Sequence, residues 1–82
     1  MRLDKFLKVS RIIKRRTVAN DACDASHVSV NGRGVKASYD VKVGDEISVS
    51  FGAKTLTVRV RSVKETVKKE EAAELYEIVS EA

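Results

Sequence analysis

Seven basic side chains lie within the first sixteen residues of this chain, accompanied by a single carboxylate. Asp4 is that carboxylate, and the seven basic residues are Arg2, Lys5, Lys8, Arg11, Lys14, Arg15 and Arg16. This end therefore carries a net charge of +6, and since the whole chain carries +4, the remaining residues sum to −2. Arginine and lysine bind phosphate oxygens. A positive field confined to one end of a chain is typical of a face that binds a polyphosphate such as a nucleic acid.

Few other side chains offer chemistry. Cys23 is the only cysteine and His27 the only histidine, so the chain offers no disulfide and no Cys/His set for zinc. Alanines beside Cys23 indicate a small buried thiol, and His27 is placed like a turn or sheet-edge residue. The sequence contains no Gly-rich phosphate loop before a helix and no partnered nucleophile. We therefore expect a binding protein, not an enzyme, with no cofactor, no catalytic residues and no metal site.

The composition narrows the class further. Eighty-two residues suffice for one domain with one small core. Two Phe, two Tyr and no Trp leave few rings for stacking on bases, which favours recognition through charge, shape and backbone contacts. No run approaches the roughly 20 apolar residues of a membrane span, and no secretory signal is evident. We expect a soluble cytoplasmic protein.

Two short helices are predicted to carry the basic residues. Leu3, Phe6 and Leu7 share one helical face in the first ten residues. Thr17 is a candidate N-cap for a second helix, whose buried face we predict to begin at Val18 and to continue through small residues. The basic link between the helices would then be held on folded structure, with its charges aimed outward.

After residue 27 the apolar period changes to two, which predicts strands. Asn31-Gly32 lies in a turn cluster over 31–34, and a strand is expected to lead out over 35–37. A second hairpin is predicted over 47–60, turning at 52–54. Residues 64–74 are predicted to form a loop or a single helical turn, and a last short strand is predicted around Tyr76 to Ile78. The expected fold class is α+β, with two short N-terminal helices packed on a small, mostly antiparallel sheet.

Four fragments in this order resemble a known family. They are MRLDKFL (1–7), KRRT (14–17), VSVNG (28–32) and VKVGD (41–45). Together they are similar to the S4 RNA-binding domain, named after small-subunit ribosomal protein four. The resemblance implies a single RNA-binding domain over 1–82, with its core motif in about 1–51 and a C-terminal hairpin and tail in about 52–82.

The later part of the chain extends the resemblance. With KKEEAA (68–73) and Tyr76 included, the chain resembles the short relatives of heat-shock protein fifteen, and among them the family of the ribosome-associated quality-control factor P. That resemblance implies a non-catalytic factor that binds 23S rRNA of the large ribosomal subunit and peptidyl-tRNA. It would act beside the quality-control elongation protein in alanine tailing of stalled nascent chains. A ribosome-associated cytoplasmic monomer without membrane contact is expected.

The resemblance also implies which residues bind RNA. The positions that match are Arg2, Lys5, Arg11, Lys14, Arg15, Arg16 and Thr17, to which the charge pattern adds Lys8. We expect Arg2 and Arg16 to matter most, and Arg33 and Lys36 on the first hairpin to make secondary contacts. The chain departs from the family pattern at two places. Ser26 replaces the usual glycine after the second helix, and Asn20-Asp21 replaces a frequent basic position.

Two other functions remain open. The chain could be an rRNA-binding accessory or assembly module that works with another rRNA-acting protein. Alternatively, the amphipathic N-terminus could serve a membrane surface or a protein partner. The first predicted helix is too short and too charged to bury much apolar surface in a membrane, which disfavours that reading.

Overall fold

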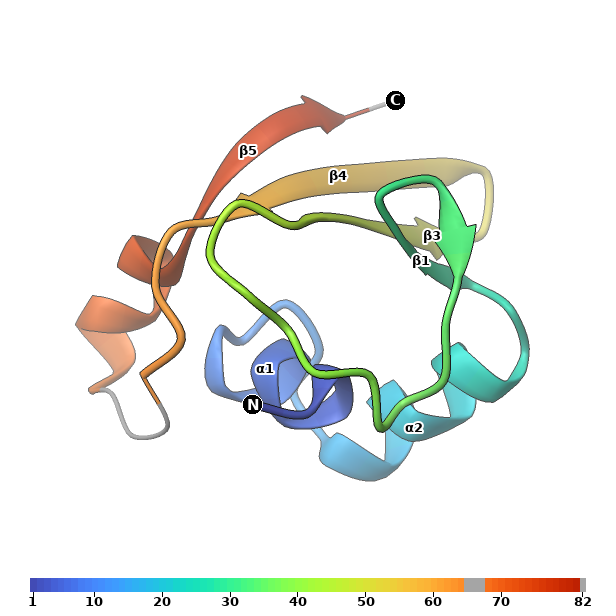
Figure 1. Cartoon of the computed structure of the whole chain (residues 1–82), viewed down its shortest axis with the longest axis horizontal. Helices are drawn as coiled ribbons and strands as arrows, with labels where there is room; N and C mark the ends of the chain where they lie inside the picture. The colour runs from blue at the N-terminus through green and yellow to red at the C-terminus, as the bar shows by residue number, and fades with distance from the viewer. Residues whose placement is uncertain (65–67, 82) are drawn as a thin grey trace.

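The computed structural model describes residues 1–64 and 68–81 (Figure 1). Two α-helices come first, and the strands that follow form one antiparallel sheet in the order β2-β1-β3-β4-β5. The helices are α1 (Leu3–Val9), α2 (Arg16–Asp24) and the 3-10 helix η1 (Lys69–Leu75), and the strands are β1 (Val28–Val30), β2 (Arg33–Gly34), β3 (Glu46–Phe51), β4 (Lys54–Val60) and β5 (Tyr76–Glu81). Both α-helices lie on one side of the sheet in Figure 1. The predicted α+β class is confirmed.

The core lies between the helices and the inner face of the sheet. Leu3, Phe6 and Leu7 of α1 are fully buried, as their common helical face predicts. The alternating residues of β3 and β4 supply the opposite wall, and they are Ile47, Val49, Val58 and Val60. Ile13 anchors the link between α1 and α2 to this core. The basic N-terminal residues are therefore carried on backbone that is packed against the core.

The second helix differs from its prediction in two respects. It begins at Arg16, with Arg15 as an extended N-cap and no side-chain cap, so the assignment of Thr17 as N-cap was wrong. Its buried residues are Ala19 and Cys23, whereas Val18 is 50% exposed. The helix is therefore turned by one residue from the predicted orientation. Ala19 is fully buried, and its small side chain leaves α2 room to pack closely on α1.

Both predicted hairpins are present with shifted ends. Asn31 and Gly32 adopt φ of 53° and 80°, the left-handed pair that a two-residue hairpin loop requires. Arg33 pairs with Val30 directly after this loop, so the second strand is 33–34 and the strand predicted over 35–37 was wrong. In the other hairpin Lys54 pairs with Phe51, which confines the turn to residues 52 and 53.

The C-terminal part adds an edge strand, β5, to the sheet. The prediction for 64–74 falls partly on residues 65–67, which lie outside the described residues; beyond them η1 buries Ala72 and Leu75. β5 confirms the predicted last strand and extends it to Glu81. On the outer face, Arg59 joins Glu46 at 3.1 Å and Glu77 at 2.9 Å. This trio ties β3, β4 and β5 together across their outer surface.

Candidate nucleic-acid interface

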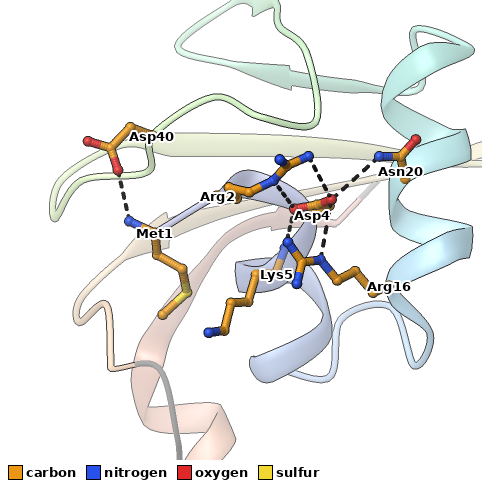
Figure 2. A network of polar contacts seen from close by, with 7 residues as sticks. All are labelled: Met1, Arg2, Asp4, Lys5, Arg16, Asn20 and Asp40. Carbon is orange, nitrogen blue, oxygen red and sulfur yellow. Dashed lines mark hydrogen bonds and ion pairs between the residues drawn. The ribbon is translucent and has the colours of Figure 1, made fainter.

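One buried carboxylate lies at the centre of the basic end. Asp4, in the first turn of α1, is 2% exposed. Its Oδ1 accepts a hydrogen bond from Nε of Arg2 at 3.2 Å, and its Oδ2 accepts one from Nη2 of Arg2 at 3.3 Å. Oδ2 also lies 3.4 Å from Nε of Arg16 (Figure 2). The two arginines that we expected to matter most therefore share one anion.

Further donors complete the surroundings of Asp4. The backbone N–H of Lys5 donates to Oδ1 at 2.8 Å, and Nδ2 of Asn20 donates to Oδ2 at 3.4 Å. Burial raises the pKa of Asp4, but the hydrogen bonds from Arg2, Asn20, Arg16 and the Lys5 amide outweigh it, so the pKa is lowered from 3.8. Asp4 is thus an anion at neutral pH, and it joins α1 to both the start and the middle of α2.

Both arginine side chains combine anchoring with exposure. The side chain of Arg2 is 51% exposed and that of Arg16 is 46% exposed. Arg16 contacts Asp4 through Nε (Figure 2). An open depression of about 410 Å³ lies beside them, lined by Arg2, Asp4, Arg16, Thr17, Asn20 and Asp21. Guanidinium groups on such a depression can bind the phosphate oxygens of a nucleic-acid backbone.

Backbone pairing holds Arg2 in place. Its neighbour Leu3 donates its N–H to the carbonyl of Tyr39 at 2.8 Å, and Val41 donates to the carbonyl of Met1 at 2.8 Å. The α-amino group of Met1 donates to Asp40 at 2.8 Å, and this contact lowers the pKa of Asp40 (Figure 2). Residues 1–3 therefore run beside residues 39–41 and are hydrogen-bonded to them. This pairing fixes the backbone position from which the Arg2 side chain extends.

The end of α1 and the link to α2 expose most of the remaining charges. Lys8, Arg11, Lys14 and Arg15 are all exposed, as is Thr17 at the start of α2. Lys5 is partly buried. Arg11 has φ of +63°, a left-handed conformation that costs a non-glycine residue about 1–2 kcal/mol. The link is thus a strained, highly basic loop next to the Arg2–Arg16 pair.

The secondary candidates form a separate surface. Arg33 lies on β2 and Lys36 lies just beyond it, and both are exposed. Lys36 borders a depression of about 320 Å³ together with Cys23, Asp24, Ser26, Gly34 and Val35, whereas neither Arg33 nor Lys36 borders the Arg2–Arg16 depression. The structure therefore brings Arg2, Arg16 and Thr17 together and leaves the hairpin pair apart from them.

Both departures from the family pattern have structural consequences. Ser26 takes φ of +63°, donating its N–H to the carbonyl of Cys23 at 3.1 Å while His27 donates to that of Ala22 at 2.9 Å. This pair of bonds is the Schellman ending that usually places glycine where Ser26 stands. Asp21 borders the Arg2–Arg16 depression, so a negative charge faces one side of the basic surface.

Sequence reasoning missed the roles of two residues in this candidate interface, Asp4 and Asn20. Asp4 was noted as the single carboxylate among the basic residues, whereas it is buried and binds both arginines. Its position among seven basic residues gives no sign of this burial. Asn20 was noted only as a departure from a basic position. Because its contact with Asp4 spans sixteen residues, no local pattern reveals it.

The described residues contain neither a cluster of metal ligands nor a membrane-spanning helix. Among residues 1–64 and 68–81, no three His, Cys, Asp or Glu side chains lie close enough together to hold a metal ion. Within the same ranges, no helix is both long and apolar enough to cross a membrane.

Comparisons with known proteins point to one family. The S4 domain model matches residues 1–47. The chain is 59% identical over 81 residues to the RQC P-site tRNA stabilizing factor of Bacillus subtilis, covering 99% of this chain and 94% of that protein. It is 56% identical over 81 residues to the protein of the same name from Streptococcus pneumoniae, with 99% and 92% covered.

Solved structures agree with the fold. The trimeric structure of heat-shock protein 15 from Vibrio cholerae superposes with a TM-score of 0.90 at 28% identity, covering 98% of this chain and 82% of that one. The solution structure of a hypothetical protein gives a TM-score of 0.82 at 30% identity, with 98% of each chain covered. The arrangement of helices and sheet is therefore one that experiment has already found in relatives.

Proposed function

Because the chain belongs to the S4-domain family of RQC P-site tRNA stabilizing factors, we propose that it is a non-catalytic RNA-binding factor of ribosome-associated quality control (RQC). It binds peptidyl-tRNA in the P site and 23S rRNA on the large ribosomal subunit, in the cytoplasm. In that position it supports C-terminal alanine tailing of stalled nascent chains beside the quality-control elongation protein. The names of its relatives and the S4 match support the tRNA and RNA parts of this role.

The observation that carries the proposal is the Arg2–Asp4–Arg16 arrangement. Two half-exposed guanidinium groups, one from the residue before α1 and one from the first residue of α2, are fixed on one buried carboxylate, beside an open depression. The RNA-binding surface, which we call the basic face, comprises Arg2, Lys5, Lys8, Arg11, Lys14, Arg15, Arg16 and Thr17. Arg33 and Lys36 provide a second, separate contact for RNA.

We propose that the chain acts as one RNA-binding domain and binds as a single copy. The core motif of about 1–51 and the C-terminal part of about 52–82 share one sheet, because β3 pairs with β4 at six positions. The related heat-shock protein 15 structure is a trimer. Light scattering on the purified protein tests whether it is a monomer, for which a mass near 9.1 kDa is expected. A trimer mass would contradict it.

Sedimentation of cell extract through a sucrose gradient tests the function. The tagged parent should travel with large subunits that carry peptidyl-tRNA, and the Arg2→Ala/Arg16→Ala variant should stay near the top. The matched control is Lys54→Ala/Arg61→Ala, which removes the same charge at two exposed positions in a different part of the molecule and should travel with the parent. If the parent itself stays at the top, or follows membranes, the proposed function is wrong.

The same gradients separate the alternative function. An rRNA-binding accessory or assembly module would sediment with incomplete large subunits and would not require peptidyl-tRNA. Puromycin takes the nascent peptide from the tRNA and leaves deacylated tRNA, so treating the subunits before the gradient should release the parent if it stabilises peptidyl-tRNA. Retention on subunits after puromycin would favour the assembly role.

Salt dependence tests the charge-driven contact. If four to six phosphates are neutralised, log affinity should fall against log salt with a slope of about −3 to −5. Arg16→Ala should cost about 1–3 kcal/mol of binding free energy if its guanidinium group makes a bidentate contact with phosphate. It should cost under about 1 kcal/mol if the contact is weak and solvent-exposed. Equal small losses at every basic position would instead indicate a diffuse field without an anchor.

A further inference from the structure

We infer that Asp4 is a positioning residue for RNA binding, a buried anion that aims the forks of Arg2 and Arg16 at the RNA backbone. This inference rests on the proposed RNA binding and deepens it. Asp4 would not touch the RNA itself. It would act through the two arginines, by fixing where their remaining N–H groups point.

The charge of Asp4 alone would work against RNA binding. It is the one acidic residue among the first sixteen, in the middle of a surface with a net charge of +6. A carboxylate at this place lowers the positive field that attracts phosphate. A benefit to binding must therefore come from geometry, because the electrostatic effect has the opposite sign.

The geometry supplies such a benefit. Arg2 precedes α1 and Arg16 opens α2, yet the Nε atoms of both lie 3.2 to 3.4 Å from the same carboxylate. Each contact holds the fork by one edge and leaves other donors for a ligand. Long arginine side chains lose much rotamer freedom on binding, and a fork that is already held loses less. Asp4 thereby preorganises the guanidinium groups of both arginines for phosphate binding.

The carboxylate is itself held firmly. It is 2% exposed, and the backbone N–H of Lys5 and the amide of Asn20 also donate to it. Asn20 lies one helical turn after Arg16, so α2 contacts Asp4 at two points. The orientation of the two forks therefore depends on how α1 packs on α2. In this way the fold of the helix pair is coupled to the shape of the basic face.

A matched pair of variants tests the inference. Asp4→Asn and the exposed control Asp24→Asn each raise the net charge by one unit. Binding of each purified full-length protein to purified large subunits carrying peptidyl-tRNA would be measured at one fixed salt concentration. Asp24→Asn should bind as the parent does or somewhat tighter. Asp4→Asn should bind roughly tenfold weaker despite its added positive charge. Binding of Asp4→Asn as tight as that of Asp24→Asn overturns the inference.

A double-mutant cycle separates positioning from a general loss of structure. In the Arg2→Ala/Arg16→Ala background the forks are absent, so Asp4→Asn should no longer weaken the residual binding. An equal loss in both backgrounds would mean that Asp4 acts through overall stability, and the inference would be wrong. Thermal unfolding of all four proteins shows which are folded at the assay temperature.

Asn20→Ala provides a test that keeps Asp4, both arginines and the net charge. Removing one donor from the carboxylate should weaken binding by roughly two- to fivefold. If Asp4→Asn does not fold, this variant decides, and an affinity equal to that of the parent overturns the inference. Failure of the parent to bind large subunits would instead overturn the proposed function, so the two failures are distinguishable.

Discussion

Asn31 and Asp45 lie fourteen residues apart and are joined by a hydrogen bond of 3.1 Å from Nδ2 to Oδ1. Asp45 also accepts from the hydroxyl of Tyr39 and the backbone N–H of Lys42, each at 3.0 Å. Asn31 in turn exchanges bonds with the backbone of Glu46, at 2.7 and 3.0 Å. The loop of the first hairpin and the turn before β3 are therefore one connected unit.

Asp45→Asn should destabilise the fold. An amide in place of the carboxylate presents its NH₂ group to at least one of three donors, which leaves that donor without an acceptor. The expected loss is about 1–3 kcal/mol of unfolding free energy. Urea denaturation followed by circular dichroism measures it. Asp40→Asn, at a highly exposed side chain, is the control and should cost less. An unchanged urea midpoint for Asp45→Asn would contradict the role of Asp45 as a junction.

Acid should destabilise the protein over a defined range. Burial raises the pKa of Asp45 and of Asp4, but hydrogen bonds to each outweigh it and lower both below 3.8. Because the folded-state values lie below the unfolded ones, the stabilisation is complete above about pH 4 and is lost as the pH falls through the folded values. Urea midpoints at successive pH values should fall below pH 4. The Asp45→Asn variant should show a shallower fall, and an equally steep one would contradict the assignment.

Local pattern was enough to predict most of the scaffold. The 3.6-residue spacing of Leu3, Phe6 and Leu7 placed α1, and Asn31-Gly32 placed the first hairpin, because both signals depend on neighbouring residues alone. Alternation likewise predicted the second hairpin and the start of β5. The start of α2 was missed, since Thr17 offered a capping side chain that the helix does not use.

The contacts that organise the basic face could not be predicted in the same way. The N-terminal basic cluster and the family resemblance selected Arg2 and Arg16 as candidates. Their common partner depends on the packing of α1 on α2, which brings residues 4, 16 and 20 together. A single acidic residue amid basic ones has no distinct pattern, and its burial is decided only by the tertiary fold.

Ser26→Gly should stabilise the protein. Ser26 holds φ of +63° at the end of α2, where glycine carries no steric cost. Releasing that strain should add about 1 kcal/mol and raise the melting temperature by about 4–8 °C for a domain of this size. Differential scanning calorimetry checks the shift. Ser26→Ala keeps the strain and should give no gain; an equal gain for both variants would show that the backbone conformation is not the cause.

Cys23 should be unreactive while the protein is folded. Burial, helped by the nearby charges of Asp4 and Asp24, raises the pKa of the thiol to about 11. Since the thiolate is the reactive form, a neutral buried thiol is slow to alkylate. Iodoacetamide labelling at pH 8, followed by mass spectrometry, should be slow in buffer and fast in urea. Rapid labelling of the native protein would contradict the burial.

Arg11→Gly should change stability and RNA binding in opposite directions. Arg11 has φ of +63° and an exposed side chain in the basic link, so the fold bears the strain of a non-glycine residue there. Strain of this kind suggests a use for the side chain. Glycine should raise the unfolding free energy by about 1 kcal/mol. It should also weaken binding to large subunits, because the proposed phosphate contact of Arg11 is removed.

Arg11→Ala separates the two effects. Alanine removes the same charge but keeps the left-handed strain, so it should lose as much affinity as Arg11→Gly without gaining stability. Binding titrations and urea denaturation of both variants give the comparison. If Arg11→Gly gained stability and bound as tightly as the parent, Arg11 would not be part of the interface. Its strained backbone would then need an explanation from folding alone.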